Sequence, residues 1–471
     1  MRTILRFALA FVLGAMIISA SYAQPPPTLL WSDPVNTLDI ALSENGQYVA
    51  VATFGQVRFY GRSSSAPLWA YSVQVSSVAI SADGNYVVAG GSTNVYFWAN
   101  AKSLPANPTP TWTSMSLGGA IIRRCLAISD DGNYVAACGQ LLTQGSNVFY
   151  WAGATGNLGL SIGTTWDYPL VDQVGAIAIS DDGDHVAAVG VLFDAGLEGV
   201  LAYWNNARSL LGHPQQPTWR GQEPNEPFVD VAISGNGNYV VVAGEALVGT
   251  VFYWANAITR TGTSETPTWA GGGGTPFSSV DISCDGDSVI AGSSRSVVSI
   301  EGGGNSVYFW AGSALVITPL QVDTHSVYFW GGARSLTDDP NPSWIYPTPN
   351  PVRDVVINDA GTYMAAIDSP TGPFTVYFFD RQGNPLWTEN IAGDKLSISC
   401  DGGTLAVGTF TSTTAYLFDT GFSDPCCAAG PVGGVLASSN RMSILAPYMA
   451  ILGFAAAASV AVVALLKRRR I

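Results

Sequence analysis

The sequence predicts an all-β fold, an eight-bladed β-propeller with one-plus-three strand closure, followed by a C-terminal transmembrane helix. One unit recurs eight times: an apolar strand that mostly ends in Ser, a turn of the Asp-Gly or Asn-Gly type, a second apolar strand, an aromatic strand, and a strand that carries Trp. Such repetition is typical of propellers, because each sheet buries its faces only against its neighbours. The turns are Asn45-Gly46, Asp83-Gly84, Asp131-Gly132, Asp182-Gly183, Asn236-Gly237, Asp285-Gly286, Ala360-Gly361 and Asp401-Gly402. The Trp residues that precede them are Trp31, Trp69, Trp112, Trp166, Trp219, Trp269, Trp344 and Trp387.

The second copy shows how each element of the unit is assigned. Apolar residues at Ser77–Ser81 and Tyr86–Gly90 flank the turn Ala82–Asn85, where Gly adopts a positive φ without steric cost. Residues Asn94–Trp98 carry apolar side chains on both faces, as expected for a sheet packed between two neighbouring blades. Pro110–Trp112 is the fourth strand, and its Pro suits an outer edge because it offers no backbone donor.

The order of elements at the two ends of the repeat predicts how the ring closes. A lone Trp strand at Leu29–Ser32 precedes the first copy, and the last copy offers Leu396–Ser399, Thr404–Thr409 and Ala415–Phe418 without a Trp strand after them. The N-terminal strand is therefore predicted to complete the last blade. Such a ring forms one domain over residues 24–420, since a propeller grows by adding blades.

The spacing of the turns predicts an insertion in one blade. Consecutive turns are 38, 48, 51, 54, 49, 75 and 41 residues apart. The longest interval, from Asp285-Gly286 to Ala360-Gly361, contains an aromatic strand twice, at Val307–Trp310 and at Val327–Trp330. We interpret the extra copy as an insertion within blade six, and a partial ninth blade is the alternative.

The two ends of the chain predict a secreted protein with one membrane anchor. Residues Met1–Ala23 have the basic start, the apolar run and the small residues of a cleaved signal peptide. Ile444–Leu466 carries no charge and as a helix would span about 35 Å, enough for a bilayer core. Basic residues stay on the cytoplasmic side, so the tail 467–471 is predicted inside and a stalk at 421–443 outside, together with the propeller. A soluble core helix is the alternative for the apolar segment.

The charge of the chain argues against two classes of function. The formal net charge is −14, and between Gln24 and Asn440 there are 13 basic and 34 acidic residues, which gives −21. Because such a surface repels nucleic acid, no nucleic-acid partner is predicted. The two lysines of this part, Lys102 and Lys395, do not follow a Gly, so a phosphate-binding loop of the Gly-Lys type is missing.

The sequence predicts no catalytic residue and no metal-ligand set. Gly159–Gly163 matches the pattern GxSxG, but that motif works at a strand-to-helix elbow, and here it falls between a third and a fourth strand. His185, His213 and His325 stand in different repeats without metal-ligand spacing. Asp181–Asp184 is acidic, but it is one more copy of the turn and lacks the spaced ligands of a calcium loop.

The six cysteines fall into three groups. Counting outward from the turn places Cys125 opposite Cys138, where a cross-strand disulfide and two buried thiols fit the sequence equally well. Cys284 and Cys400 occupy the same place in blades two apart, too far to bridge each other, and we interpret them as structural. Cys426-Cys427 lies in the predicted stalk, where lipidation, an intermolecular disulfide and no role at all are open.

Function is expected where the repeat is interrupted. The first-to-second turns are uniformly short, whereas the second-to-third connections lengthen in blades three to seven, on the same side as the fourth-to-first connections. We call this side the loop face and the opposite side the turn face. Loops on a rigid scaffold commonly carry binding sites, and a solvated acidic rim that keeps the protein soluble is the alternative. The candidate binding residues are Asp172, Asp194, Glu198, Glu223, Glu226, Glu245, Glu301 and Asp368.

Three stretches resemble known families. SVAISADGNYVVAGGSTNVYFW, from Ser77 to Trp98, is similar to the repeat of WD-repeat propellers, without the Gly-His and Trp-Asp pairs of true WD repeats. VYFFDRQGNPLW, from Val376 to Trp387, looks like the repeat of quinoprotein-type eight-bladed propellers. PVGG at Pro431 and LAPY at Leu445, with the basic stop, are similar to the membrane tails of archaeal secreted surface proteins.

Two hypotheses of function follow, and the fold by itself does not choose between them. The first is a non-catalytic binding or interaction module at the cell surface, whose acidic loop face binds a protein, a glycan or a cation. The second, implied by the quinoprotein resemblance, is an oxidoreductase, or alternatively a lyase, that uses the propeller channel. The sequence names no cofactor for either.

Overall fold

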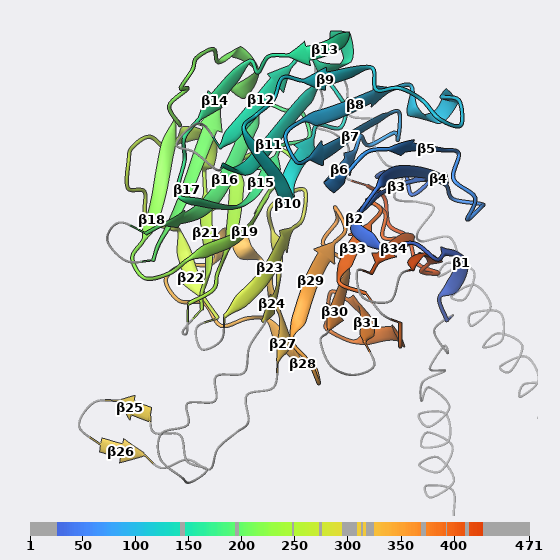
Figure 1. Cartoon of the computed structure of the whole chain (residues 1–471). Helices are drawn as coiled ribbons and strands as arrows, with labels where there is room; N and C mark the ends of the chain where they lie inside the picture. The colour runs from blue at the N-terminus through green and yellow to red at the C-terminus, as the bar shows by residue number, and fades with distance from the viewer. Residues whose placement is uncertain are drawn as a thin grey trace, which may run out of the picture. The chain divides into compact units, whose positions relative to one another are not determined.

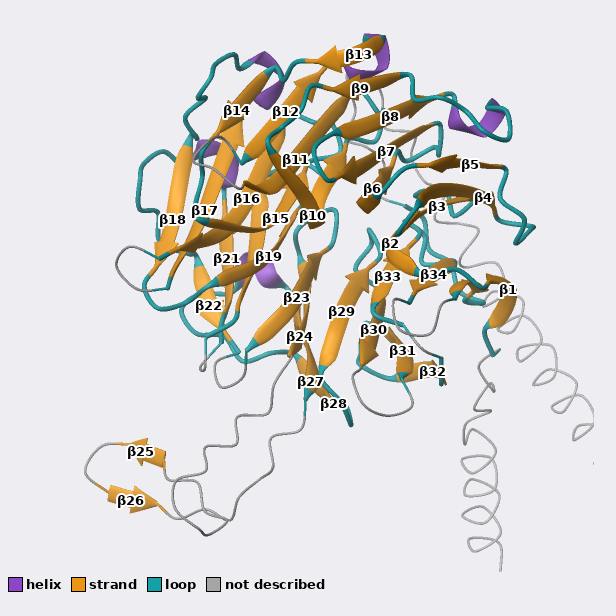
Figure 2. Cartoon of the chain, in the orientation of Figure 1, coloured by secondary structure: helices purple, strands orange, loops and turns teal. Residues whose placement is uncertain are grey.

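Eight sheets follow one another along the described part of the chain in the computed structural model (Figures 1 and 2); each has four antiparallel strands, and one has a fifth strand at its edge. The structure describes residues 26–141, 147–193, 197–246, 249–272, 276–293, 309–311, 314–316, 325–368, 374–391, 393–409 and 414–426. The sheets are numbered as blades in the order of their turns, and the strands of each blade are given from the inside outward.

Blades one to four use consecutive strands, with one extra strand at the outer edge of blade two. Blade one consists of β2 (Thr37–Leu42), β3 (Tyr48–Thr53), β4 (Gln56–Gly61) and β5 (Trp69–Ser72). Blade two consists of β6 (Val75–Ile80), β7 (Tyr86–Gly91), β8 (Val95–Ala99) and β9 (Trp112–Ser114), and β13 (Gly159–Ile162) pairs with β9 in parallel. Blade three consists of β10 (Gly119–Ile128), β11 (Tyr134–Leu141), β12 (Val148–Ala152) and β14 (Trp166–Tyr168). Blade four consists of β15 (Gln173–Ile179), β16 (His185–Leu192), β17 (Glu198–Asn205) and β18 (Trp219–Glu223).

Blades five to eight include one insertion and the closing strand. Blade five consists of β19 (Phe228–Ile233), β20 (Tyr239–Gly244), β21 (Val251–Ala255) and β22 (Trp269–Gly271). Blade six consists of β23 (Phe277–Ile282), β24 (Ser288–Ser293), β27 (Ser326–Gly331) and β28 (Trp344–Pro347). Blade seven consists of β29 (Val352–Ile357), β30 (Tyr363–Asp368), β31 (Thr375–Asp380) and β32 (Pro385–Glu389). Blade eight consists of β33 (Lys395–Ile398), β34 (Thr404–Gly408), β35 (Ala415–Asp419) and β1 (Thr28–Asp33). Short 3-10 turns follow third strands at η1 (Ala101–Ser103), η2 (Ala154–Gly156), η3 (Ala207–Ser209), η4 (Ala257–Thr259) and η5 (Ala333–Ser335).

The first strands of the blades form a closed ring. Each contacts the first strand of the next blade, from β2 through β6, β10, β15, β19, β23 and β29 to β33, and β33 contacts β2 again. The ring encloses a central channel. The prediction of an eight-bladed propeller is therefore confirmed.

Both irregular features of the ring follow the sequence prediction. The N-terminal strand β1 pairs antiparallel with β35, with Trp31 opposite Leu417, so the one-plus-three closure is confirmed. In blade six the second aromatic copy forms β27, whereas the first copy contributes β25 (Phe309–Ala311), which pairs only with β26 (Ala314–Val316). The extra copy is an insertion in blade six and not a ninth blade.

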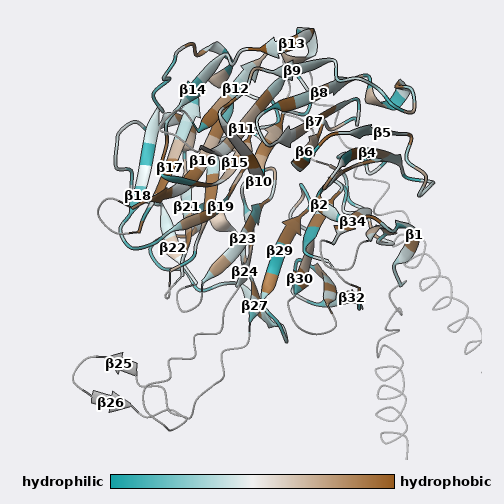
Figure 3. Ribbon diagram, viewed as in Figure 1, coloured by the Kyte–Doolittle hydropathy of each residue, from teal (hydrophilic) through white to brown (hydrophobic). Residues whose placement is uncertain are grey.

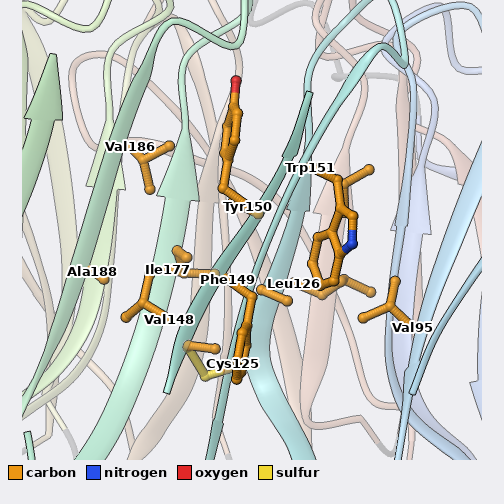
Figure 4. Close-up of a cluster of buried hydrophobic side chains, with 14 of the residues drawn as sticks. Val95, Cys125, Leu126, Val148, Phe149, Tyr150, Trp151, Ile177, Val186 and Ala188 are labelled. Carbon is orange, nitrogen blue, oxygen red and sulfur yellow. A yellow bond between two sulfur atoms is a disulfide. The ribbon is translucent and has the colours of Figure 1, made fainter. Parts of the chain in front are cut away.

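Neighbouring blades pack against each other through their apolar strands, which appear brown in Figure 3. In blade three, Trp151 of β12 lies toward Val95 of blade two, while Val148 lies toward Ala188 of blade four (Figure 4). The fourth-strand Trp adds a polar link between blades. The indole of Trp112 stacks on Phe97 of its own blade at 5.1 Å and donates to a backbone oxygen in η2 of the next blade. The same donor bond joins Trp69, Trp166, Trp219 and Trp269 to η1, η3, η4 and η5.

A recurring hydrogen-bond motif explains the Ser and Asp-Gly signature of the turns. The Ser81 hydroxyl donates to Oδ1 of Asp83 (3.0 Å) and accepts the N–H of Tyr86 (3.0 Å), while the same Oδ1 accepts the N–H of Asn85 (2.8 Å). Gly84 has φ +76°, and a Cβ there would collide with the ring of Tyr48 in the preceding blade. Gly therefore serves both the turn and the close approach of two blades.

Two disulfides lie in the described chain. Cys125 of β10 is bonded to Cys138 of β11, with Cα atoms 4.6 Å apart. Cys400 is bonded to Cys426, with Cα atoms 5.1 Å apart, a pairing that sequence reasoning missed because it treated these residues separately. After β35 the chain turns back on blade eight, where the N–H of Asp424 donates to the oxygen of Asp401, and this brings Cys426 to Cys400.

The predicted signal peptide (1–23) and transmembrane helix (444–466) lie outside the described residues. Within the residues that are described, no helix is both long enough and apolar enough to cross a bilayer.

Candidate functional site

The structure brings some of the predicted acidic residues together and gives others structural contacts. Asp194 and Glu301 lie outside the described residues. Asp368 is buried, and its carboxylate accepts the N–H of Thr375 (2.9 Å) and the hydroxyl of Tyr377 (3.1 Å). It therefore braces the connection between β30 and β31.

The other five carboxylates gather on blades four and five. In the register of blade four, Leu192 pairs with Glu198, and Gly199 pairs with Glu223, so both glutamates stand at one end of the blade. Asp172 accepts the N–H of Phe193 (2.8 Å) at the same end. On blade five, Glu226 accepts the N–H groups of Ala246 (3.3 Å) and Thr250 (3.2 Å), and the N–H of Glu245 donates to the oxygen of Pro227 (2.9 Å). We call Asp172, Glu198, Glu223, Glu226 and Glu245 the acidic corner.

Two exposed apolar side chains lie within the acidic corner. Phe193 and Leu197, at the connection between β16 and β17, are each 50% exposed. No ion pair joins the five carboxylates to a basic side chain within the described ranges. Burial raises the pKa of Glu226 to about 7 and raises the pKa of Glu223. The corner thus combines apolar surface with carboxylates that no basic side chain of the described residues neutralises.

A second set of functional candidates lies in the channel, beginning with a bulge near its loop-face end. The first strands of blades one to seven contain a register shift there, and in blade one it amounts to the single extra residue Leu38. In blade three, Ile121 pairs with Gly139 and Leu126 with Ala137, so four residues stand opposite Cys138 alone. Such wide bulges re-aim side chains. Arg124, with φ +63°, lies in this bulge.

Arg124 reaches across the channel. Its guanidinium donates to Oδ1 of Asp354 on blade seven (3.1 Å) and lies 3.6 Å from Oδ2 of Asp230 on blade five. It also donates to the backbone oxygens of Ser278 and Arg353. Because blades three and seven are opposite each other in a ring of eight, this one side chain ties the two halves of the ring together.

The partners of Arg124 are themselves anchored. Oδ2 of Asp230 accepts the N–H of Val280 (3.1 Å), and Oδ2 of Asp354 accepts the N–H of Leu396 (2.9 Å). The ammonium of Lys395 lies 3.9 Å from Asp354. We call Arg124, Asp230, Asp354 and Lys395 the trans-channel network. An enzyme of the quinoprotein-like kind would use the channel as its site, and this network crosses the channel end that faces the loops.

The middle of the channel holds a cavity of about 360 Å³. Its walls are alternating small and branched apolar residues from the first strands of blades one to five, including Ala127, Ile128, Ala178 and Ile179. Asp281 of blade six is the one charged residue that lines it among the described residues. Oδ1 and Oδ2 of Asp281 accept the N–H groups of Ile282 (2.9 Å) and Ile357 (2.9 Å), respectively. Burial raises the pKa of Asp281 to about 7.

A ring of backbone hydrogen bonds frames the turn-face end of the channel. The backbone N–H of the residue before each turn donates to the backbone oxygen of the corresponding residue in the next blade. In blade one the donor is the N–H of Asn45, one residue further on. The bonds run from Ala82 N to Asp130 O (3.2 Å), Asp130 N to Asp181 O (2.9 Å), Asp181 N to Gly235 O (3.0 Å), Gly235 N to Cys284 O (3.0 Å), Cys284 N to Asp359 O (3.1 Å), Asp359 N to Cys400 O (3.3 Å), Cys400 N to Glu44 O (3.0 Å) and Asn45 N to Ala82 O (3.4 Å).

Four of the eight residues in this ring are acidic: Glu44, Asp130, Asp181 and Asp359. We call them the carboxylate rim. Glu44 and Asp130 share a side-chain hydrogen bond. Burial raises the pKa of Glu44, and burial with the neighbouring carboxylates raises the pKa of Asp130 and Asp181. Like charges cannot all ionise at such a site, so the rim holds protons at neutral pH.

One further acidic cluster is already neutralised. Ligand atoms of Asp182, Asp184 and His185 lie within 4.8 Å of one another. However, the Arg208 guanidinium lies 3.6 Å from Asp182 and 3.1 Å from Asp184. The cluster is therefore an ion pair at a turn.

Sequence reasoning missed the trans-channel network and the carboxylate rim. The signal for the first is the pair Arg123-Arg124 beside Cys125, the position at which other copies carry Asp39, Asp230 and Asp354. The signal for the second is the residue before the turn, which is acidic in four copies of eight. Both become visible only when the same position is compared across the blades.

Comparisons with known proteins agree with the fold. Residues 66–99 match the family model of the WD domain, G-beta repeat. No curated protein matches the sequence. Among solved structures, the C-terminal WD40 domain of Sif2 is similar with a TM-score of 0.58 and 13% identity, over 84% of this chain and 98% of that one.

Two other solved propellers are similar to the same extent. Sqt1 of Chaetomium thermophilum, bound to the N-terminus of the ribosomal protein L10, has a TM-score of 0.58 at 15% identity, over 82% of this chain and 97% of that one. BamB of Moraxella catarrhalis has a TM-score of 0.53 at 14% identity, over 84% and 98%. At these identities the likeness shows the fold alone.

Proposed function

We propose that this propeller is a non-catalytic interaction module, held outside a cell membrane by its C-terminal segment, and that the acidic corner binds a basic protein. The observation that carries the proposal is the acidic corner itself, where Phe193 and Leu197 are half exposed among carboxylates without basic partners in the described chain. Exposed apolar residues rimmed by polar ones mark protein interaction sites.

The chemistry of the corner fits a protein better than a glycan. Aromatic and aliphatic side chains anchor protein interfaces at their centre, while charges at the rim steer encounter and select the partner. Glu198, Glu223 and Glu245 supply these charges at the edge of the acidic corner. The net charge of −21 for residues 24–440 adds long-range attraction for a cationic partner. The Sqt1 propeller with its bound protein N-terminus supports the use of such a scaffold for protein binding.

The proposed cellular location is inferred from the sequence. A signal peptide at 1–23, a hydrophobic segment at 444–466 and the basic tail 467–471 support secretion with a single anchor, and the tail motifs support an archaeal surface protein. Protease added to intact cells should then digest the propeller, and a tag after Ile471 should stay protected.

Site-specific photocrosslinking of the full chain in its native cells tests the binding surface. A photoreactive phenylalanine analogue at Phe193 should crosslink one basic protein, whereas the analogue at Leu211, which is 78% exposed on the outer rim, should not. Replacement of Glu198, Glu223 and Glu245 by Gln should remove the Phe193 crosslink, and added salt should weaken it, since exposed charges are screened over about 8 Å at physiological ionic strength. Equal products from positions 193 and 211 would contradict the proposal.

A further inference from the structure

From the cavity and its two ends, we infer that the channel binds a small linear diammonium compound. The compound enters through the carboxylate rim and places one ammonium at Asp281, its methylene chain along the apolar wall, and its second ammonium at the rim. This site is separate from the acidic corner and does not depend on a partner protein.

The cavity has the size and the lining of a ligand site. Its volume of about 360 Å³ falls in the range of about 300–1,000 Å³ that is usual for small-molecule pockets. Most of the lining is Ala, Ile, Leu or Val, which favours an aliphatic body over a hydrated inorganic ion. A mostly apolar pocket with few polar groups fixes the orientation of its ligand through those groups.

Asp281 supplies the inner charge. Its two oxygens accept only backbone N–H groups among the bonds of the described residues, and an ionised carboxylate offers about four acceptor sites, so capacity for an ammonium remains. No ion pair links Asp281 to a basic side chain in the described ranges. This distinguishes it from Asp230 and Asp354, whose charge Arg124 already compensates.

The carboxylate rim supplies the outer charge. Glu44, Asp130 and Asp181 likewise have no ion pair with a basic side chain within the described chain. A cation at the rim would relieve the repulsion among these groups, and the shared proton would leave as it binds.

Geometry sets the length of the compound. Asp281 and the rim residue of its own blade, Cys284, are three positions apart on the strand, which corresponds to about 10 Å along the channel. An extended chain of six methylenes between two ammonium groups has a similar length. The apolar layer between the two charged layers, with Ile128, Ile179 and Ile233, matches that chain. The opposite end of the channel is crossed by the trans-channel network, so the rim is the entrance.

Titration calorimetry on the purified full chain in non-ionic detergent tests the inference with three matched probes: hexane-1,6-diamine, hexylamine and hexan-1-ol. We expect the diamine to bind at least tenfold more tightly than hexylamine, and hexan-1-ol not to bind, because charge and not apolarity alone selects the ligand. Asp281→Asn should weaken both amines by tenfold or more. The triple change Glu44→Gln, Asp130→Asn, Asp181→Asn should bring the diamine down to the level of hexylamine.

Two further variants keep the test decisive. Ala127→Leu fills the cavity and should abolish binding, and Asp83→Asn, which removes an exposed carboxylate from a turn on the same face, should leave it unchanged. The melting temperature of each variant shows whether it is folded. Diamine binding that is equal in the parent, Asp281→Asn and Ala127→Leu would overturn the inference, as would the absence of binding to the parent. Tighter binding of Nα-acetyl-lysine methylamide than of the diamine would overturn it too, because it would assign the site to a lysine of a partner protein.

Discussion

The two ends of the propeller channel carry opposite electrostatic arrangements on the same repeated backbone. At the loop-face end, Arg124 joins Asp230 and Asp354, so these buried charges have opposite partners. At the turn-face end, Glu44, Asp130 and Asp181 stand close to one another without a basic partner in the described chain. The first arrangement holds the ring together, and the second opposes its stability.

The difference arises from two positions of the repeat. In three blades an Asp near the start of the first strand accepts an N–H group of the next blade, as Asp39 does from Val78 (3.0 Å), Asp230 from Val280 and Asp354 from Leu396. These carboxylates thus have a structural task that recurs. At the residue before the turn the backbone makes the ring bond, and among the described hydrogen bonds the carboxylates of Glu44, Asp130 and Asp181 accept no N–H group of the next blade.

The largest effect is expected from removing Arg124, one of the two cations of the trans-channel network. Arg124→Ala leaves Asp230 buried without a basic partner among the described residues and leaves Asp354 with Lys395 alone, at 3.9 Å. Breaking a buried ion pair by removing one partner costs about 3–5 kcal/mol. Denaturant unfolding of the variant should show a correspondingly lower midpoint. Arg208→Ala is the matched control, because its ion pairs at an exposed turn are worth less than about 1 kcal/mol.

A rescue experiment separates charge from packing at this end. Adding Asp230→Asn to Arg124→Ala should recover part of the lost stability, since the carboxylate without a basic partner is then gone while most of its N–H contacts remain. Asp354 is kept, because it still pairs with Lys395. If this double variant is less stable than Arg124→Ala alone, Asp230 stabilises the ring without Arg124, and the comparison of the two ends fails.

The next effect concerns the disulfide that holds the bulge. Cys125 adjoins Arg124 and is bonded to Cys138, which faces the bulge on β11. Replacing both cysteines by Ser should lower the free energy of unfolding by about 3 kcal/mol, the size expected for a loop of this length. The same change at Cys400 and Cys426 provides a comparison at the turn face. A loss at Cys125 and Cys138 below 1 kcal/mol would show that the bulge holds its shape without the covalent link.

The sequence predicted most of the fold and little of the channel, and the reason is physical. Blade number, closure and the insertion are readable because turn glycines and strand apolarity must repeat for the sheets to stack. The Cys400–Cys426 bond was not predicted, because residues after Phe418 follow no repeat and their return to blade eight is a tertiary contact. Arg124 was missed because pattern reasoning does not show how far a bulge projects a side chain.

The third prediction uses pH to compare the two ends. The pKa of Asp281 is raised to about 7 from a usual value of 3.8, so the folded protein binds a proton there that the unfolded chain releases. Stability from this group is therefore complete below about pH 4 and is lost as the pH rises through 7. The carboxylate rim acts in the same direction. The melting temperature should fall between pH 5 and pH 8, and Asp281→Asn should flatten that fall. A melting temperature that rises over this interval would contradict the raised pKa values.

The smallest effect distinguishes the rim carboxylates from the turn carboxylates that stand beside them in sequence. Oδ1 of Asp83 accepts the Ser81 hydroxyl and the N–H of Asn85, bonds that an Asn side-chain oxygen can also accept, as Asn45 does in blade one. Asp83→Asn therefore keeps these bonds and loses only the exposed ion pair with Lys102 (3.1 Å), so it should change the free energy of unfolding by less than about 1 kcal/mol. Ser81→Ala removes both the donor to Asp83 and the acceptor for Tyr86, so it should cost about 1–3 kcal/mol. Thermal unfolding of the two variants at pH 5 and pH 8 completes the comparison, because neither should alter the fall in stability with pH that Asp281 and the rim produce. If Asp83→Asn flattened that fall as strongly as Asp281→Asn, the charge that opposes folding would lie in the turns and not in the channel.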